Sequence, residues 1–171
     1  MKFNENIIAD INHTYKVRGC RAKHESVQKK FEHLMIHYPT FAFVFFWRTK
    51  KKITYFNRLF TSNYECKIFR STKIDGGLVC FHPFSTVINA KAIGENFEFR
   101  NGLTVGNKFN DNNLLPVIGN NVTVGANVCI IGDICIGDNV TIGAGSVVVK
   151  SVPSNSVIVG NPARVIKTLE M

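Results

Sequence analysis

Histidine is the side chain in this sequence best suited to proton transfer near neutral pH, and one histidine stands apart from the rest. From residue 66 onward His82 is the only one, whereas the others lie in the first 37 residues: His13, His24, His33 and His37. A hydroxyl is a weak nucleophile, and a positioned imidazole can remove its proton as it attacks. His82 is therefore the candidate general base. On spacing alone, the competing interpretation is a histidine that is merely exposed or hydrogen-bonded at a turn.

The cysteines follow no metal-binding or redox pattern. They are odd in number and include no C-x-x-C pair: Cys20, Cys66, Cys80, Cys129 and Cys135. The sequence opens without the long apolar stretch of a secretory signal, so we expect a cytoplasmic protein with reduced thiols that behave as small apolar residues. No metal site is predicted.

The element that must position His82 is a repeat. An aliphatic residue recurs every six positions at Ile118, Val124, Ile130, Ile136, Ile142 and Val148, and a second apolar column runs two residues earlier at Val122, Val128, Ile134 and Val140. The same spacing holds from Ile68 to Cys80 and from Ile93 to Val105, with a one-residue slip between these sets. This period fits neither a helix nor an ordinary sheet and is typical of a hexapeptide parallel β-helix. Glycine follows the aliphatic residue at 119, 125, 137 and 143, where we expect it to let the chain turn a corner.

Two departures from the repeat indicate loops. Between Gly106 and Val117 the spacing skips, and a polar stretch ending in proline predicts a loop at 107–116 that leaves the coil. After Val149 the repeat ends, and Pro153 and Pro162 are expected to close the solenoid. Cys129 and Cys135 precede core aliphatic residues, so they are predicted to face outward with Thr123 and Thr141.

The first 65 residues have a helical pattern. Residues 25–37 carry apolar side chains at helical spacing, and Pro39 should end that helix or begin the next. An aromatic stretch at 40–47 is followed by a basic run at 48–52 and an apolar piece at 53–60. We expect the aromatic stretch to pack against the main domain or a neighbouring subunit. The alternative is peripheral contact with the inner membrane, since aromatic residues beside Lys and Arg can lie at a membrane interface.

The excess of positive over negative charge lies in the first 70 residues. The chain has 171 residues and a formal net charge of +9, and the first 70 residues hold 14 Lys/Arg against 5 Asp/Glu. This asymmetry predicts either a solvated basic face or an anionic partner. No nucleic-acid-binding module accompanies the basic run, so a nucleic-acid partner is not expected. No apolar run is long enough to span a membrane.

Residues 66–166 resemble the left-handed β-helix domain of serine acetyltransferase-like hexapeptide-repeat acyltransferases, which include capsular polysaccharide O-acetyltransferases. The resemblance rests on several stretches: Gly77-Leu78 followed by His82, Val87-Ile88-Asn89, Gly102-Leu103-Thr104-Val105-Gly106, Ile142-Gly143-Ala144-Gly145-Ser146 and the ending Gly160-Asn161-Pro162-Ala163-Arg164-Val165. It implies a mainly β chain, with a helical segment at 1–65 and a left-handed β-helix acyltransferase domain at 66–171. It also implies a homotrimer with the cleft between subunits.

The resemblance assigns roles residue by residue. His82 falls on the family's general base, which deprotonates the acceptor hydroxyl for attack on the thioester of acetyl-CoA. Ala126 and Ala144 fall where the pantetheine arm is contacted, and Gly106 where the extended loop leaves the coil. Lys150 and Arg164 fall near the nucleotide end of acetyl-CoA, where their charges suit its phosphates.

Three departures bear on the acceptor. The aspartate that steadies the base in this family is replaced by Lys67, and Glu65 could substitute if the strand is regular, because it would share a strand face with Lys67. The loop's end has Leu114-Leu115 where serine-binding members have a cationic pair, and their serine-contacting aspartate falls near Arg18-Gly19.

These departures favour an acetyl-CoA-dependent O-acetyltransferase that acts on a sugar or polysaccharide hydroxyl. Two alternatives remain: a serine acetyltransferase proper, acting in cysteine biosynthesis on a small-molecule acceptor, and a non-catalytic β-helix scaffold. A cytoplasmic location, with or without peripheral contact at the inner membrane, fits all of them.

Overall fold

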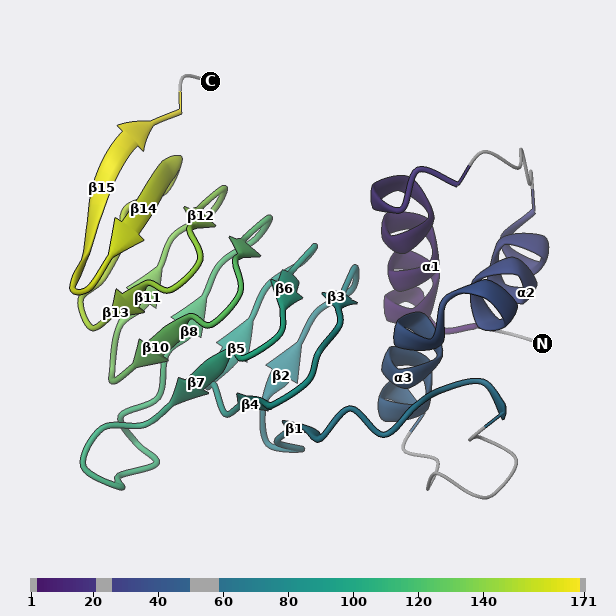
Figure 1. Cartoon of the computed structure of the whole chain (residues 1–171), viewed down its shortest axis with the longest axis horizontal. Coiled ribbons are helices and arrows are strands. Elements are labelled where there is room, and N and C mark those ends of the chain that lie inside the picture. The colour runs from purple at the N-terminus through teal and green to yellow at the C-terminus, as the bar shows by residue number, and fades with distance from the viewer. Residues whose placement is uncertain (1–2, 21–25, 50–58, 170–171) are drawn as a thin grey trace.

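The computed structural model describes residues 3–20, 26–49 and 59–169. Three helices precede fifteen short strands, and the strands wind into a solenoid whose successive coils are visible side by side in Figure 1. The helices lie at the end where the solenoid begins, and the C-terminal strands lie at the opposite end. The predicted mainly β chain with a parallel β-helix is confirmed.

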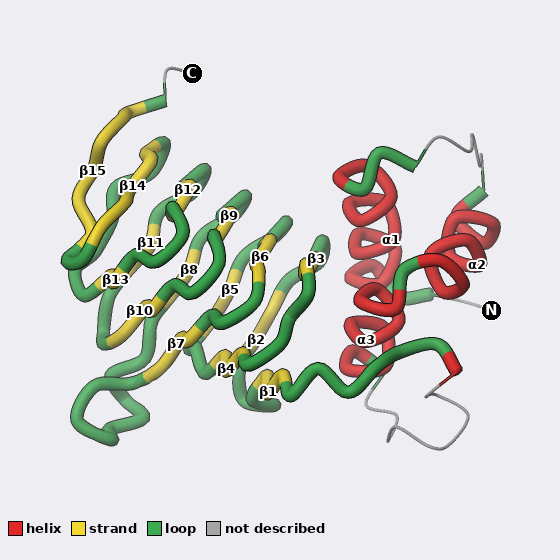
Figure 2. The backbone as a smooth tube through the Cα atoms, viewed as in Figure 1, coloured by secondary structure: helices red, strands yellow, loops and turns green. Residues whose placement is uncertain are grey.

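Each of the first four coils contributes one strand to each of three sheets, and these strands pair in parallel. The first sheet has the order β1-β4-β7-β10-β13, the second β11-β8-β5-β2, and the third β15-β14-β12-β9-β6-β3. Short loops join the sheets at three corners, as the tube in Figure 2 shows. The strands are β1 (Cys66–Ile68), β2 (Lys73–Ile74), β3 (Val79–Phe81), β4 (Thr86–Ile88), β5 (Ala92–Ile93), β6 (Glu98–Arg100), β7 (Thr104–Gly106), β8 (Val117–Ile118), β9 (Thr123–Val124), β10 (Cys129–Ile131), β11 (Cys135–Ile136), β12 (Thr141–Ile142), β13 (Val147–Val148), β14 (Ser156–Gly160) and β15 (Ala163–Thr168).

The six-residue columns are the core. Every residue of the aliphatic column from Ile118 to Val148 is at most 2% exposed, and the second column from Val122 to Val140 is buried too. Cys129 and Cys135 are only partly buried and exposed respectively, as their outward positions predicted. The last strand, β15, departs from the winding and pairs antiparallel with β14.

The glycines that follow the core aliphatic residues serve a purpose other than the one predicted. They do not adopt the left-handed backbone conformation; a Cβ at Gly125 would lie 2.5 Å from the amide nitrogen of Ala144, in the next coil. Glycine is needed there because the coils approach closely. One series of left-handed corner positions is instead occupied by asparagines, whose side chains form a hydrogen-bonded ladder: Asn96, Asn121, Asn139 and Asn155.

The helices form a second, smaller core. They are α1 (Glu5–Val17), α2 (Val27–His37) and α3 (Pro39–Arg48). Phe41, Phe45 and Phe46 of α3 are buried in the helical core, whereas Val44 belongs to the core of the β-helix. The aromatic stretch therefore packs, as predicted. Residues 50–52 of the basic run and 53–58 of the apolar piece lie outside the described residues, and within the described part no helix is long and apolar enough to cross a membrane.

A buried ion pair joins the two cores. The Asp10 carboxylate on α1 accepts hydrogen bonds from Arg48 Nε at 2.8 Å and from Nη2 at 3.0 Å. The same carboxylate accepts from the backbone N–H groups of Gly77 and Leu78, at 2.8 and 2.7 Å. Arg48 also donates to the Ile74 carbonyl. The Gly-Leu stretch before His82 is thus held against the helices through Asp10.

Candidate active site

His82 lies in a corner that is wider than its neighbours in the stack. The corner joins β3 to β4, and four residues separate Phe81 from Thr86, whereas three separate Arg100 from Thr104 in the next coil. Counted by register, the widening is two residues: Phe81 pairs with Arg100 and Val87 with Thr104, so five residues lie between the paired positions in the first corner and three in the next.

The geometry of this corner leaves the imidazole accessible. His82 has a left-handed backbone (φ +50°), its carbonyl accepts a hydrogen bond from the Phe84 N–H at 2.7 Å, and its side chain is exposed. A left-handed backbone is uncommon for a residue other than glycine and is often found at functional sites. His82 is therefore free to meet a ligand rather than being held in the core.

Glu65 lies one coil before this corner, but not where a regular strand would place it. It precedes β1, and its φ of +49° removes it from the strand, so the expected shared face with Lys67 is wrong. Cys66 pairs with Thr86, which sets Glu65 beside Ser85 in the stack. The Glu65 carboxylate is exposed and has no hydrogen-bond partner within the described chain. Its role beside the base stays a prediction.

Ala126 and Ala144 lie along the same edge of the solenoid as His82. Ala126 follows β9 and Ala144 follows β12, at the corner that leads from the third sheet to the first. They are two and three coils beyond β3, and coils are ~4.8 Å apart, so Ala144 is roughly 14 Å along the axis from the His82 corner. Ala126 is half-buried, Ala144 is exposed, and both present small side chains.

Gly106 ends β7, and the predicted loop begins directly after it. A Cβ at Gly106 would make only ordinary contact, so space does not explain this glycine. The loop arches over the next coils and, with Ile131, Gly132 and Val149, encloses a cavity of about 410 Å³ to which Phe109 and Leu114 also contribute. This cavity is largely apolar.

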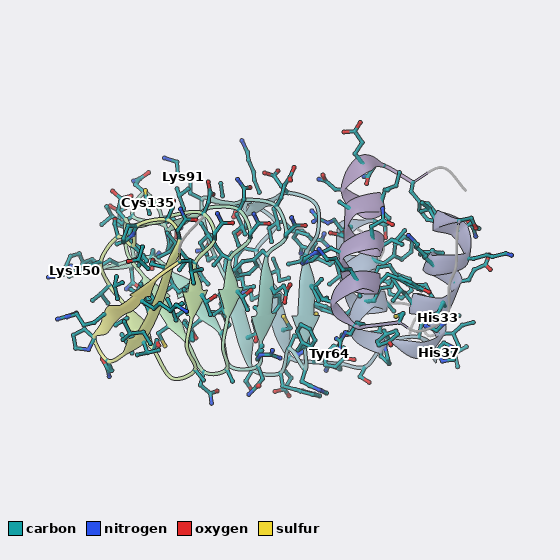
Figure 3. The ribbon with its side chains drawn as sticks, turned by 90° about the horizontal axis from the view of Figure 1, so that it is seen from above. His33, His37, Tyr64, Lys91, Cys135 and Lys150 are labelled. Atoms are coloured by element: carbon teal, nitrogen blue, oxygen red, sulfur yellow. The ribbon has the colours of Figure 1, made fainter. Side chains whose placement is uncertain are left out.

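Lys150 and Arg164 lie together at the far end of the solenoid. Both are exposed, and both line a cavity of about 310 Å³ with Pro162 and Val165. Figure 3 shows Lys150 at the end of the molecule opposite the helices. The predicted site residues thus do not share one pocket: His82, Ala126 and Ala144 lie along one edge, Gly106 ends and Lys150 follows a strand of the first sheet, and Lys150 and Arg164 lie at the far end. A ligand that contacts both His82 and the far end must be elongated.

The sequence did not predict a cationic cluster next to His82. The guanidinium carbons of Arg18 and Arg100 lie 4.1 and 4.7 Å from the centre of the Phe81 ring, and Phe81 directly precedes His82. Burial lowers the pKa of Arg18 from its ordinary value, although an arginine stays protonated in proteins. Arg100 could have been found by counting three six-residue repeats and the one-residue slip from Phe81. Arg18 had no such signal.

The comparisons with known proteins agree with this geometry. Residues 116–150 match the family model of the bacterial transferase hexapeptide (six repeats). This part of the chain thus carries the hexapeptide repeats found in bacterial transferases.

One relative is the colanic acid biosynthesis acetyltransferase WcaB of Escherichia coli K12, 54% identical over 85 residues, which are 49% of this chain and 52% of that protein. The chloroplastic serine acetyltransferase 1 of Arabidopsis thaliana is 39% identical over 70% of this chain and 40% of its own length. The chain thus spans about half the length, or less, of these relatives. The crystal structure of Neisseria gonorrhoeae serine acetyltransferase superposes with a TM-score of 0.71 at 25% identity, covering 98% of this chain and 67% of that one.

Proposed function

We propose that this protein transfers an acetyl group from acetyl-CoA to an acceptor hydroxyl, with His82 as general base. The observation that carries the proposal is the exposed imidazole in the widened corner, with two small-residue corners along the same edge and a cation-lined cavity at the far end of the solenoid. The relatives named acetyltransferases support the reaction class.

The arrangement from His82 to the far end of the solenoid suits acetyl-CoA. This molecule is elongated, with a thioester at one end and phosphates at the other. Lys150 and Arg164 supply positive charge for the phosphates, and Ala126 and Ala144 leave room for the arm to pass along the corner. This arrangement directs the thioester towards His82. A further copy of the chain would close the groove, and we therefore propose a homotrimer.

In the reaction, His82 takes the proton from the acceptor hydroxyl as its oxygen attacks the thioester carbonyl. A carbon–oxygen bond forms, the carbon–sulfur bond breaks, and the proton passes from the imidazole to the leaving thiolate. Backbone N–H groups at the corner are suited to stabilise the oxyanion. Glu65 is proposed to orient the imidazole.

A saccharide hydroxyl is the proposed acceptor, in preference to L-serine. The position near which serine-binding members of the family carry an aspartate is occupied by Arg18, whose charge would repel the ammonium group of serine. The identity to a colanic acid acetyltransferase, higher than that to the plant serine acetyltransferase, also supports a saccharide.

The test measures release of free CoA from acetyl-CoA in the presence of L-serine, neutral sugars and oligosaccharides. His82→Asn should lower turnover by about 10²–10⁴-fold, the usual contribution of a general base. The matched control is His37→Asn, because His37 is an exposed histidine at the far end of the helical segment, as Figure 3 shows.

Full activity of His82→Asn would refute the mechanism. If the wild-type chain neither releases CoA nor binds acetyl-CoA in calorimetry, the non-catalytic scaffold is the better interpretation. Glu65→Gln should lower turnover without altering the affinity for acetyl-CoA, and an unchanged rate would remove Glu65 from the mechanism.

A further inference from the structure

The surroundings of Phe81 combine two positive charges with the candidate base. Phe81 and His82 are consecutive, so their Cα atoms are ~3.8 Å apart. Arg18 reaches the Phe81 ring from the end of α1, and Arg100 reaches it from β6, whose Arg100 pairs in register with Phe81. Two guanidinium groups from distant parts of the chain therefore converge beside the catalytic corner.

Neutral groups hold Arg18 in place. Its Nη2 donates to Thr40 Oγ1 and to the Cys80 carbonyl oxygen, each at 2.9 Å, and its guanidinium also lies over the Tyr38 ring at 5.4 Å. Its Nε atom is buried and has no hydrogen-bond partner. The charge of Arg18 is thus positioned without being neutralised, and its Nε–H group has no acceptor.

The carboxylates of Glu98 on β6 and Asp10 on α1 are occupied elsewhere. Glu98 lies two residues before Arg100 on the same strand, but its carboxylate contacts His13 Nε2 at 3.0 Å. Asp10 is bound by Arg48 and by two backbone N–H groups. Within the described chain, neither Arg18 nor Arg100 forms an ion pair. Two like charges kept close without a counter-ion repel each other, and a bound anion would relieve that repulsion.

We propose that the acceptor carries an anionic group, a carboxylate or a phosphate, which Arg18 and Arg100 bind while its hydroxyl faces His82. This inference rests on the proposed acetyltransferase function and specifies its substrate class as acidic saccharides. Guanidinium groups suit this role because they bind carboxylate and phosphate through parallel hydrogen bonds.

Ligand binding tests the inference without turnover. Saturation-transfer NMR compares methyl glucuronide with methyl glucoside, which differ in the carboxylate, and glucose 6-phosphate supplies the phosphate arm. The anionic sugars should bind roughly tenfold more tightly than methyl glucoside, the effect of one hydrogen bond between charged groups. Arg100→Gln should remove this preference; because Arg100 is exposed, the variant is expected to fold. The control is Lys73→Gln, an exposed cation on the second sheet.

Activity provides the second measurement. For the wild type, kcat/KM should be about tenfold higher with anionic than with neutral sugars, and Arg100→Gln should reduce only the former. If neutral sugars bind and react as well as anionic ones, and His82→Asn abolishes both reactions, this inference is overturned while the proposed function stands. If no acceptor releases CoA, the proposed function fails and this inference fails with it. A preference for glucose 6-phosphate over methyl glucuronide would assign the anion as a phosphate.

Discussion

Replacing Arg48 with methionine should weaken the junction between helices and β-helix more than most substitutions. Asp10 is 2% exposed, and the Arg48 side chain is 7% exposed. The substitution leaves the carboxylate buried with only the Gly77 and Leu78 N–H groups. Breaking a buried pair on one side costs about 3–5 kcal/mol. For a chain of this size, that corresponds to a fall in Tm of roughly 6–20 °C.

The loss of stability in the Arg48→Met variant should depend on pH, and the direction of that dependence follows from the pKa of Asp10. Burial raises the pKa of Asp10 above its ordinary value, while the charge and hydrogen bonds of Arg48 oppose this rise. Without Arg48 the pKa rises further. An acid whose pKa is raised by folding stabilises the folded state at low pH and loses that contribution as pH rises through the folded pKa. The deficit of the variant should therefore be largest at neutral pH and shrink in mild acid.

Urea unfolding of wild type and variant at about pH 8 and about pH 5 measures this difference. A deficit that stays constant or grows between these values would refute the account of a stranded carboxylate. The double variant Asp10→Asn/Arg48→Met should be more stable than Arg48→Met and should lack the pH dependence. Lys73→Met is the control, because Lys73 is an exposed cation on β2 in no ion pair of the described chain. Its effect should stay within about 0.5 kcal/mol.

Three further outcomes test the cavity, the thiols and the core. Arg164→Gln should raise the KM for acetyl-CoA roughly tenfold, and Lys150→Gln should raise it less. Unchanged KM values would show that the cavity lined by Lys150 and Arg164 does not bind the phosphates of acetyl-CoA. Burial raises the pKa of Cys66 to about 12, so brief alkylation at about pH 8 should label the exposed Cys135 and spare Cys66 until the chain unfolds, with labelling of Cys66 increasing at higher pH. Equal labelling in peptide mass spectrometry would contradict this. Phe97→Ala should lower the free energy of unfolding in urea by about 3–5 kcal/mol, because Phe97 is fully buried. A loss below about 1 kcal/mol would show that neighbouring side chains move into the cavity.

The core of the β-helix was predictable because its neighbours are regular in sequence. Each coil packs on the next, so a fixed spacing places Ile118, Val124 and Ile130 in successive sheets of one coil. The sequence showed a one-residue slip between the set that ends at Cys80 and the set that begins at Ile93. In the structure, the interval from Cys80 to Ile88 takes eight residues instead of six, and the extra residues widen the corner that holds His82.

The surroundings of His82 were not predictable in the same way. The expected role of glycine in turning corners was wrong, since the spacing reports position but not whether space or backbone conformation demands the residue. The expected strand face of Glu65 was also wrong. The alternation of faces holds only within a regular strand, and Glu65 lies outside β1 with a left-handed backbone (φ +49°).

The sequence alone determined the repeat, the buried columns, the loop at 107–116 and the exceptional histidine, because each depends on residues close in the chain or related by a constant period. Only the tertiary structure decided what stands beside that histidine. Arg18 and Arg100 are 82 positions apart, and Asp10 reaches Gly77 across 67. Such pairs meet because three helices dock against the first coil, and the angle of that docking depends on packing and on buried charge, which leave no periodic trace in the sequence.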